Sequence, residues 1–335
     1  MAAKIGGSWQ LAVCRWQFFG LWQTFLNLAS NFASKKQILK KIRIGTRGSK
    51  LALWQANYTK ASLEEKGIEV ELVIIKTTGD LVQHLSFDKI EGKGFFTKEI
   101  EDALLRGDVD MAVHSMKDLP TTQPDGLVVA GVSYREDPAD CLLIRQGELV
   151  DNQLFKLKIG AKVGTSSARR KAQLLGFRPD LQLVDIRGNV PTRLDKLRSG
   201  DFDAIMLANA GLARLQLELD GIEKIQLNVR EFVPAPAQGV LAFQCCADDI
   251  ETRSLIQQHL HEPKTSAVTN VERKVLKLIG GGCHLPLGVY CERDSGGNYH
   301  VWAAKADTWD SPVRRVRLSQ STSFGLAEKV VEGLN

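Results

Sequence analysis

From Lys41 onward, short apolar runs that suit strands alternate with segments that have helical spacing. KIRIGT (41–46) alternates like a strand, LALWQANYTKASLEEKG (51–67) has helical spacing and ends at a glycine, and VELVIIKT (70–77) is β-branched and apolar. Alternation of this kind is typical of a largely parallel sheet covered by helices. The sequence therefore predicts an α/β fold.

The chain contains two pairs of similar segments, which indicate an internal sequence repeat. IGTRGS (44–49) has a counterpart in VGTSSA (163–168), since each is the end of an expected strand followed by a helix. GDVDMAVHSMKDL (107–119) is matched in the same way by GDFDAIMLANAGL (200–212). Two α/β domains of related topology explain both pairs of similar segments better than chance similarity of common turns does.

The later part of the chain reads differently from this repeat. PAPAQGVLAFQC (234–245) supplies a proline-rich link and one more strand, which can return to the first domain. We therefore expect one α/β domain over 41–133 plus 240–257 and a second over 139–233. A smaller α+β domain, with a helix followed by strands, is expected over 262–335.

Residues 1–40 differ from the rest in composition. They hold five basic residues and no acidic one, so they account for the whole net charge of +5 and leave the remainder neutral. A neutral remainder argues against general nucleic-acid affinity. The apolar run from Trp9 to Phe32 is interrupted by Arg15 and amides, which makes it too polar for a membrane span. We interpret 1–40 as a disordered or non-native extension of a cytoplasmic protein, or of an organelle stromal one if the extension is a targeting peptide.

The six cysteines show no CxxC pair and no metal-ligand spacing with histidine, so neither a metal site nor a disulfide framework is predicted. Cys283 stands in the glycine-rich stretch GGGCHLPLG (280–288). Three glycines before it allow another molecule to approach the sulfur. Chemistry alone leaves a reactive thiol and a buried one equally plausible for Cys283, and it favours a structural role for His284.

Basic residues gather where strands end and helices begin. In GTSSARRKAQ (164–173), Arg169 and Arg170 are expected in the first turn of a helix, facing outward beside free backbone amides. Cations there oppose the helix dipole unless an anion is bound, although a solvated charged face is the plain alternative. The next expected strand, 181–188, ends in Arg187. A cleft for a ligand with several carboxylates or phosphates is indicated by these residues together with Arg47, Lys93, Lys98 and Arg193.

Taken together, these motifs resemble the porphobilinogen deaminase (hydroxymethylbilane synthase) family over essentially all of residues 41–335. The similarity rests on many separate stretches that stand in the order and spacing usual for the family. They are IGTRGSKLALWQ, GKGFFTKEIEDALL, AVHSMKDLPT, REDPAD, VGTSSARRKAQL, IRGNVPTRLDKL, PAPAQG and GGGCHLPLG.

The resemblance implies two related α/β domains that form a cleft, as in periplasmic binding proteins, with the small C-terminal domain beside them. It implies a transferase that joins four porphobilinogen units head to tail with loss of ammonia and then hydrolyses the product to hydroxymethylbilane. Each pyrrole carries an acetate and a propionate, which accounts for the many Arg and Lys residues. A dipyrromethane cofactor, made from substrate, is expected on Cys283 through a thioether. We expect a monomer with a small-molecule substrate and no nucleic-acid or membrane partner.

The resemblance also assigns residues. Asp118 matches the family's catalytic carboxylate, suited to stabilising a pyrrole cation and moving protons. His114 is expected to pack within its strand. The cofactor-binding positions would be Cys283, Lys117, Thr165, Ser167, Arg169, Arg170, Arg187, Asn189 and Gln238. The substrate-binding positions would be Arg47, Ser49, Lys93, Lys98, Arg193 and Arg214.

A second class of function also fits part of the pattern. A non-catalytic solute-binding protein with two similar α/β domains would use the same arginines to hold an oxyanion. That interpretation leaves Asp118 and the loop of Cys283 unexplained.

Overall fold

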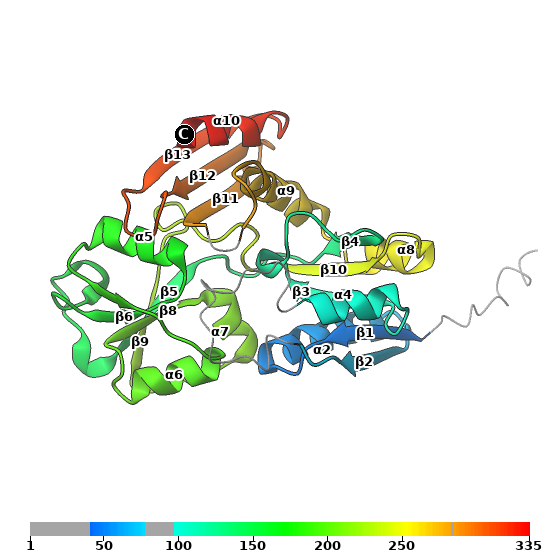
Figure 1. Ribbon diagram of the computed structural model, residues 1–335, viewed down its shortest axis with the longest axis horizontal. Coiled ribbons are helices and arrows are strands. Elements are labelled where there is room, and N and C mark those ends of the chain that lie inside the picture. The colour runs from blue at the N-terminus through cyan, green and yellow to red at the C-terminus, as the bar shows by residue number, and fades with distance from the viewer. Residues whose placement is uncertain (1–40, 78–96, 283–284) are drawn as a thin grey trace, which may run out of the picture. The chain divides into compact units, whose positions relative to one another are not determined.

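The computed structural model describes residues 41–77, 97–282 and 285–335, and residues 41–335 belong to one unit. Within these ranges the strands form three sheets, two of five strands and one of three (Figure 1). The predictions for residues 1–40, Lys93, Cys283 and His284 lie outside the described residues.

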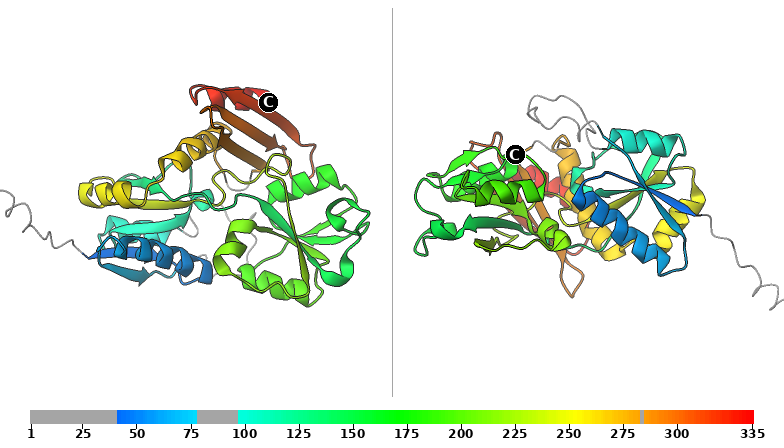
Figure 2. Two further views of the ribbon diagram at one scale, coloured as in Figure 1. Left: turned by 180° about the vertical axis from the view of Figure 1, so that it is seen from behind. Right: turned by 90° about the horizontal axis from the view of Figure 1, so that it is seen from below.

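The first sheet has the strand order β2-β1-β3-β10-β4. Strands β2, β1 and β3 are parallel, whereas β10 is antiparallel to both β3 and β4. Helices α2 and α8 lie on one face of the sheet and α4 lies on the other (Figure 2, right). Leu63 of α2 and Ile256 of α8 belong to the core on the first face, and Leu104 of α4 belongs to the core on the second. The bounds are β1 Ile42–Thr46, α2 Lys50–Glu64, β2 Val70–Ile74, α4 Lys98–Leu105, β3 Met111–Ser115, β4 Leu127–Val132, β10 Leu241–Cys246 and α8 Ile250–His259.

The second sheet repeats this plan with the order β7-β6-β8-β5-β9. Here β7, β6 and β8 are parallel, and β5 is antiparallel to β8 and β9. Leu174 of α5 packs on one face, while Leu194 of α6 and Leu212 of α7 pack on the other. The bounds are β5 Asp140–Arg145, β6 Lys162–Gly164, α5 Ala168–Phe177, β7 Gln182–Val184, α6 Val190–Arg198, β8 Ala204–Ala208, α7 Asn209–Leu215 and β9 Ile222–Gln226.

Two crossover segments, 133–139 and 227–240, connect the sheets. The first leads from β4 into β5, and the second returns from β9 into β10, so each crossover ends in the fourth strand of the sheet it enters. The segments touch at Gly239, whose φ is +91° and where an added Cβ would meet the carbonyl oxygen of Glu136 at 2.3 Å. Glycine is required here because both the backbone angle and the close approach exclude a side chain.

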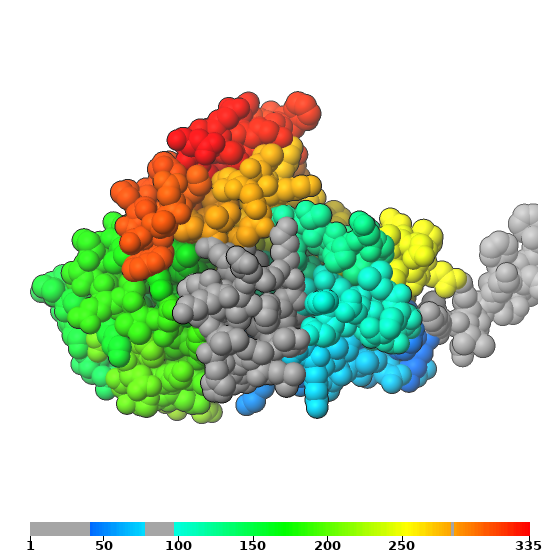
Figure 3. Space-filling view, viewed as in Figure 1, coloured from blue at the N-terminus to red at the C-terminus, as the bar shows by residue number. Residues whose placement is uncertain are grey.

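The third sheet is antiparallel, in the order β11-β12-β13. Val275 of α9 and Val330 of α10 pack against Val289 of β11 to form its core. Figure 3 shows atoms of this C-terminal part of the chain, coloured orange to red, on the surface of the molecule. The Val289 N–H donates to the carbonyl of Pro234 at 3.0 Å, which ties the sheet to the second crossover. The bounds are α9 Pro263–Leu278, β11 Leu287–Arg293, β12 Tyr299–Lys305, β13 Arg314–Gln320 and α10 Leu326–Leu334.

The predicted α/β fold class is confirmed, with two differences of detail. Each large sheet contains one antiparallel strand, which its crossover connection introduces. The strand expected to end in Arg187 ends at Val184 instead, because Asp185 and Ile186 already belong to the loop before α6. Within the described ranges, no helix has the length and apolar character needed to cross a bilayer.

Candidate active site

The turn after β3 holds two charged side chains between two buried ones. Met116–Asp118 forms a single 3₁₀ turn, and the N–H of Met116 donates to the carbonyl of Val240 at 2.9 Å. Met116 and Leu119 are buried in one apolar cluster, whereas Lys117 is half-buried and Asp118 is exposed. The apolar residues thus fix the turn and leave the Asp118 carboxylate accessible.

His114 lies in β3, as expected, and its imidazole is buried. Its Nε2 is 3.1 Å from Oε1 of Gln244 on the neighbouring strand β10. Burial, with a smaller contribution from the charge of Arg47, lowers the pKa of His114 from 6.5 to about 4, while the bond to Gln244 opposes the shift. The imidazole is therefore neutral at pH 7 and serves the packing of the sheet.

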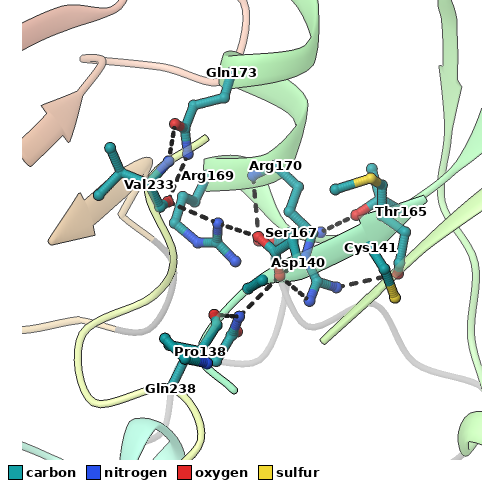
Figure 4. A network of polar contacts seen from close by, with 12 residues as sticks. Pro138, Asp140, Cys141, Thr165, Ser167, Arg169, Arg170, Gln173, Val233 and Gln238 are labelled. Carbon is teal, nitrogen blue, oxygen red and sulfur yellow. Dashed lines mark hydrogen bonds and ion pairs between the residues drawn. The ribbon is translucent and has the colours of Figure 1, made fainter. Parts of the chain in front are cut away.

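The start of helix α5 corrects one expectation about the two arginines. Ser167 is the N-cap and its Oγ accepts from the N–H of Arg170 at 3.4 Å. Arg169 and Arg170 do not face outward, since their exposed fractions are 5% and 7%. Both guanidinium groups point toward Asp140, the first residue of β5 (Figure 4).

Asp140 is fully buried and accepts from both arginines. Arg169 Nη1 donates to Oδ2 at 2.6 Å, and Arg170 Nη2 donates to Oδ1 at 2.8 Å. Burial alone would raise the pKa of Asp140, but the two guanidinium charges outweigh it and hold this pKa well below its usual range. The anion that the helix dipole calls for is therefore supplied in part by the chain itself.

Gln238 joins this cluster to the turn after β3. Its Nε2 donates to Asp140 Oδ1 at 2.9 Å and to the carbonyl of Pro138 at 2.7 Å, and its Oε1 accepts from Lys117 Nζ at 3.5 Å. Burial is the main cause of a lowered pKa at Lys117, and the charges of Arg170 and Arg169 add to it. Asp118 and Asp140 oppose that shift.

Thr165 and the start of α6 complete the second-sheet part of the site. Thr165 is buried, and its Oγ1 accepts from the N–H of Ser167 at 3.3 Å. Asn189 caps α6 by accepting from the N–H of Thr192 at 3.0 Å, and Arg193 Nε donates to the carbonyl of Gly188 at 2.8 Å.

The surroundings of Arg193 carry an excess of positive charge. Its pKa is lowered to about 10, first by burial and then by the charges of Arg170 and Arg187. Because two neighbouring guanidinium charges lower the pKa of Arg193, this region has a positive potential, which an anionic ligand would relieve.

The remaining predicted residues lie beside the first sheet or in α7. Ser49 caps α2 by accepting from Ala52 N–H at 3.3 Å, Arg47 is half-buried just after β1, and Lys98 is exposed at the first position of α4. Arg214 is buried, with its guanidinium 5.7 Å from the ring centre of Trp54 and its Nη2 donating to Gly239 O at 2.7 Å. Arg214 thus contacts a crossover segment, and no contact links it to Asp140 among the described residues.

Sequence reasoning missed two buried carboxylates. Asp140 organises the arginines, and Glu272 of α9 accepts from Arg135 Nη1 at 2.6 Å and from the backbone of Ala237 and Cys291. The available signal was the REDPAD stretch, which contains both Arg135 and Asp140. Nothing in that stretch says that the carboxylate of Asp140 is buried, and Glu272 lies outside it.

The sequence of the chain is similar to one family of known proteins. Residues 42–254 match the family model described as "Porphobilinogen deaminase, dipyromethane cofactor binding domain". A protein named porphobilinogen deaminase from Geotalea daltonii is 46% identical over 256 residues, covering 76% of this chain and 78% of that protein. One of the same name from Nitratidesulfovibrio vulgaris is 43% identical over 279 residues, covering 83% and 86%.

Similarity to solved structures is much weaker. A periplasmic substrate-binding protein of an ABC transporter from Coxiella burnetii aligns with a TM-score of 0.41 and 14% identity, covering 67% of this chain and 93% of that one. The fold class therefore rests on the sheets described above. The sequence matches favour an enzyme family over the solute-binding alternative, and the chain belongs to the porphobilinogen deaminase family.

Proposed function

We propose that this chain is a transferase that condenses four porphobilinogen molecules head to tail on a covalent dipyrromethane primer, with release of ammonia, and then hydrolyses the product to hydroxymethylbilane. The observation that carries the proposal is the cluster of cations at the starts of α5 and α6. Arg170, Arg187 and Arg193 are close enough for Arg170 and Arg187 to lower the pKa of Arg193. A growing chain of pyrrole acids supplies the anions that such a cluster favours.

The residues present fit a dipyrromethane, which carries four carboxylates on two rings. Asp140 offsets part of the charge of Arg169 and Arg170, and the positive potential around Arg193 supports binding of further carboxylates. When bound, the cofactor supplies the pyrrole carbon to which the next unit is joined. The chain would hold it through the Cys283 thiol and through Lys117, Thr165, Ser167, Arg169, Arg170, Arg187, Asn189 and Gln238.

Asp118 is the proposed catalytic carboxylate. It is exposed on a turn that the buried Met116 and Leu119 fix in place, so its carboxylate can reach a bound pyrrole. Loss of ammonia from the substrate leaves positive charge on the ring nitrogen, and a fixed carboxylate stabilises that charge. The protonated form of the same group can give its proton to the leaving amine, and the carboxylate can take one from the ring carbon that has formed the new bond. Lys117, one position earlier, is suited to a substrate carboxylate.

The substrate itself would meet Arg47, Ser49, Lys93, Lys98, Arg193 and Arg214. We propose that the protein works as a cytoplasmic monomer, which fits the small-molecule substrate. Each of these assignments is a separate target for substitution.

The covalent primer is tested by intact mass under denaturing conditions. Wild-type protein should exceed the polypeptide mass by two condensed pyrrole units, and Cys283→Ser should lack this increment. Cys246→Ser is the matched control, because Cys246 is a half-buried thiol in β10, and it should keep the increment. A bare wild-type mass that porphobilinogen does not change would contradict the proposed function.

The catalytic role is tested by Asp118→Asn. We expect turnover to fall by about 10² to 10⁴, the range for loss of a general acid–base group, while the folded protein still binds porphobilinogen. Asp125→Asn removes an exposed carboxylate a few residues away and should leave turnover unchanged. Equal turnover in the two variants would remove Asp118 from the mechanism.

A further inference from the structure

Arg273 of helix α9 contacts the turn that carries Asp118. Its Nη1 donates to the carbonyl oxygens of Met116 at 3.0 Å and Leu119 at 2.9 Å, and its Nη2 donates to that of Pro120 at 2.6 Å. A planar guanidinium with several fixed donors is suited to holding three carbonyls at once. One side chain thus holds the backbone on both sides of Asp118.

The turn is also held by interactions that do not involve Arg273. The carbonyl of Met116 also accepts from the N–H of Leu119 at 3.3 Å, and that of Pro120 also accepts from Gln123 Nε2 at 2.9 Å. Met116 and Leu119 are moreover buried in an apolar cluster of the first sheet. Without Arg273 the turn keeps these interactions, so its loss would loosen the turn without unfolding it.

A second contact joins the same two regions just after the end of α9. Gly281 has φ of +59°, and an added Cβ would meet Oγ1 of Thr121 at 2.7 Å. Thr121 follows Pro120 directly, and Gly281 stands two positions before Cys283 in the sequence. The segment that leads from α9 toward Cys283 therefore packs against the segment that leaves the Asp118 turn.

Helix α9 is itself fixed at this point. Glu272, the neighbour of Arg273, is fully buried and accepts from both Nη atoms of Arg135 at 2.6 and 3.2 Å. A helix held in this way provides a rigid base for the Arg273 side chain.

We propose that Arg273 is a positioning residue for Asp118, which fixes the Asp118 turn relative to α9 and so relative to the chain that leads to Cys283. The inference rests on the proposed function, because it matters only if the chemistry joins a group on Cys283 to a carboxylate on Asp118. Small displacements of a catalytic group cost large factors in rate, so Arg273 should act on turnover more than on binding.

The test compares Arg273→Gln and Arg273→Lys with Lys274→Gln. Lys274 is exposed on the same helix and pairs with Glu328 at the surface, so its replacement controls for loss of a charge from α9. For each protein we would measure the unfolding midpoint, the primer by intact mass, and kcat and KM for porphobilinogen. Arg273→Gln should keep the primer and lose about 10-fold in kcat with a much smaller change in KM. Arg273→Lys should lie between it and wild type, because an ammonium lacks the guanidinium fork.

A kcat of folded Arg273→Gln within twofold of wild type would overturn the positioning role. If Arg273→Gln does not fold, Arg273→Lys is combined with Asp118→Glu, whose longer side chain already displaces the carboxylate. The effect of Arg273→Lys on kcat should then be smaller than it is beside the wild-type Asp118, and an unchanged effect would overturn the inference. A wild-type protein with neither primer nor turnover would instead refute the proposed function, so the two failures are distinguishable.

Discussion

The two five-stranded sheets share one topology, but positions that are charged in one sheet are uncharged at the equivalent place in the other. In each sheet the fourth strand begins opposite the last residue of the third, so Asp140 faces Ala208 and Leu241 faces Ser115. The second sheet therefore has a buried carboxylate where the first has a buried leucine.

The helix starts differ in the same way. Ser49 and Ser167 are equivalent N-caps, but the second and third helical positions are Leu51 and Ala52 in α2, and two arginines in α5. The ion cluster of the second sheet thus has an apolar counterpart in the first.

The turn after the third strand shows the reverse arrangement. Lys117 and Asp118 follow β3, whereas the corresponding positions after β8 are Ala210 and Gly211. One scaffold thus serves two purposes, because one copy holds clustered cations with an internal counter-ion and the other presents a carboxylate. This separation matches the proposed roles of ligand binding and proton transfer.

The largest effect is expected when the second sheet loses its carboxylate. Asp140→Asn leaves two buried guanidinium groups without a counter-charge, so the free energy of unfolding should fall by about 3–5 kcal/mol in urea titrations at pH 7. Because the pKa of Asp140 is lowered in the folded state, its contribution is fully present above about pH 4 and is lost only in stronger acid. Asp185→Asn is the control, because the Asp185 carboxylate that pairs with Lys171 is exposed and its loss should cost less than about 1 kcal/mol.

Copying the first sheet into the second sharpens this test. Asp140→Leu combined with Arg169→Leu and Arg170→Ala reproduces the apolar residues of the first sheet, and replacement of a whole buried ion cluster is often neutral. The triple variant should be more stable than Asp140→Asn and should carry no primer. A triple variant that still carries the primer would show that the cluster is structural only.

A smaller effect concerns His114, whose counterpart in the second sheet is the non-titrating Leu207. The folded-state pKa of about 4 lies below the ordinary 6.5, so the neutral form is favoured in the native state. Stability is then full above pH 6.5 and decreases by about 3 kcal/mol as the pH falls to 4. His114→Gln keeps a donor for Gln244 and does not titrate, so its unfolding free energy should lose less over this range. Parallel curves for the two proteins would contradict this origin of the pH dependence.

Much of the scaffold was predictable from the sequence, because its signals are local. Period-2 and period-3.6 patterns marked the strands and helices around IGTRGS and VGTSSA. The similarity between 107–119 and 200–212 marked positions that are equivalent in the two sheets.

The pairing of charges was not predictable. Arg169 and Asp140 are 29 positions apart, and Arg273 and Met116 are 157 apart, so their contacts depend on the crossover connections. Sequence patterns also do not separate a cation that awaits a ligand from one already paired inside the protein. The outward-facing arginines were wrong for this reason, although their site roles stay a prediction.

The smallest effect tests whether the N-cap serines of the two repeats contribute equally to the free energy of unfolding. Ser49 accepts from Ala52 N–H at 3.3 Å, and Ser167 accepts from Arg170 N–H at 3.4 Å. Ser49→Ala and Ser167→Ala should each lower the unfolding free energy by about 1 kcal/mol, the usual value of an N-cap. Ser199→Ala, an exposed hydroxyl at a helix C-terminus, is the control and should change it by less than about 0.5 kcal/mol.

Equal losses would mean that the cap belongs to the shared scaffold and that the ion cluster was added to it. A loss at Ser167 several times larger than at Ser49 would contradict this view. The cap would then hold Arg170 in place for Asp140, and the two helix starts would share a sequence pattern without sharing its energetic role.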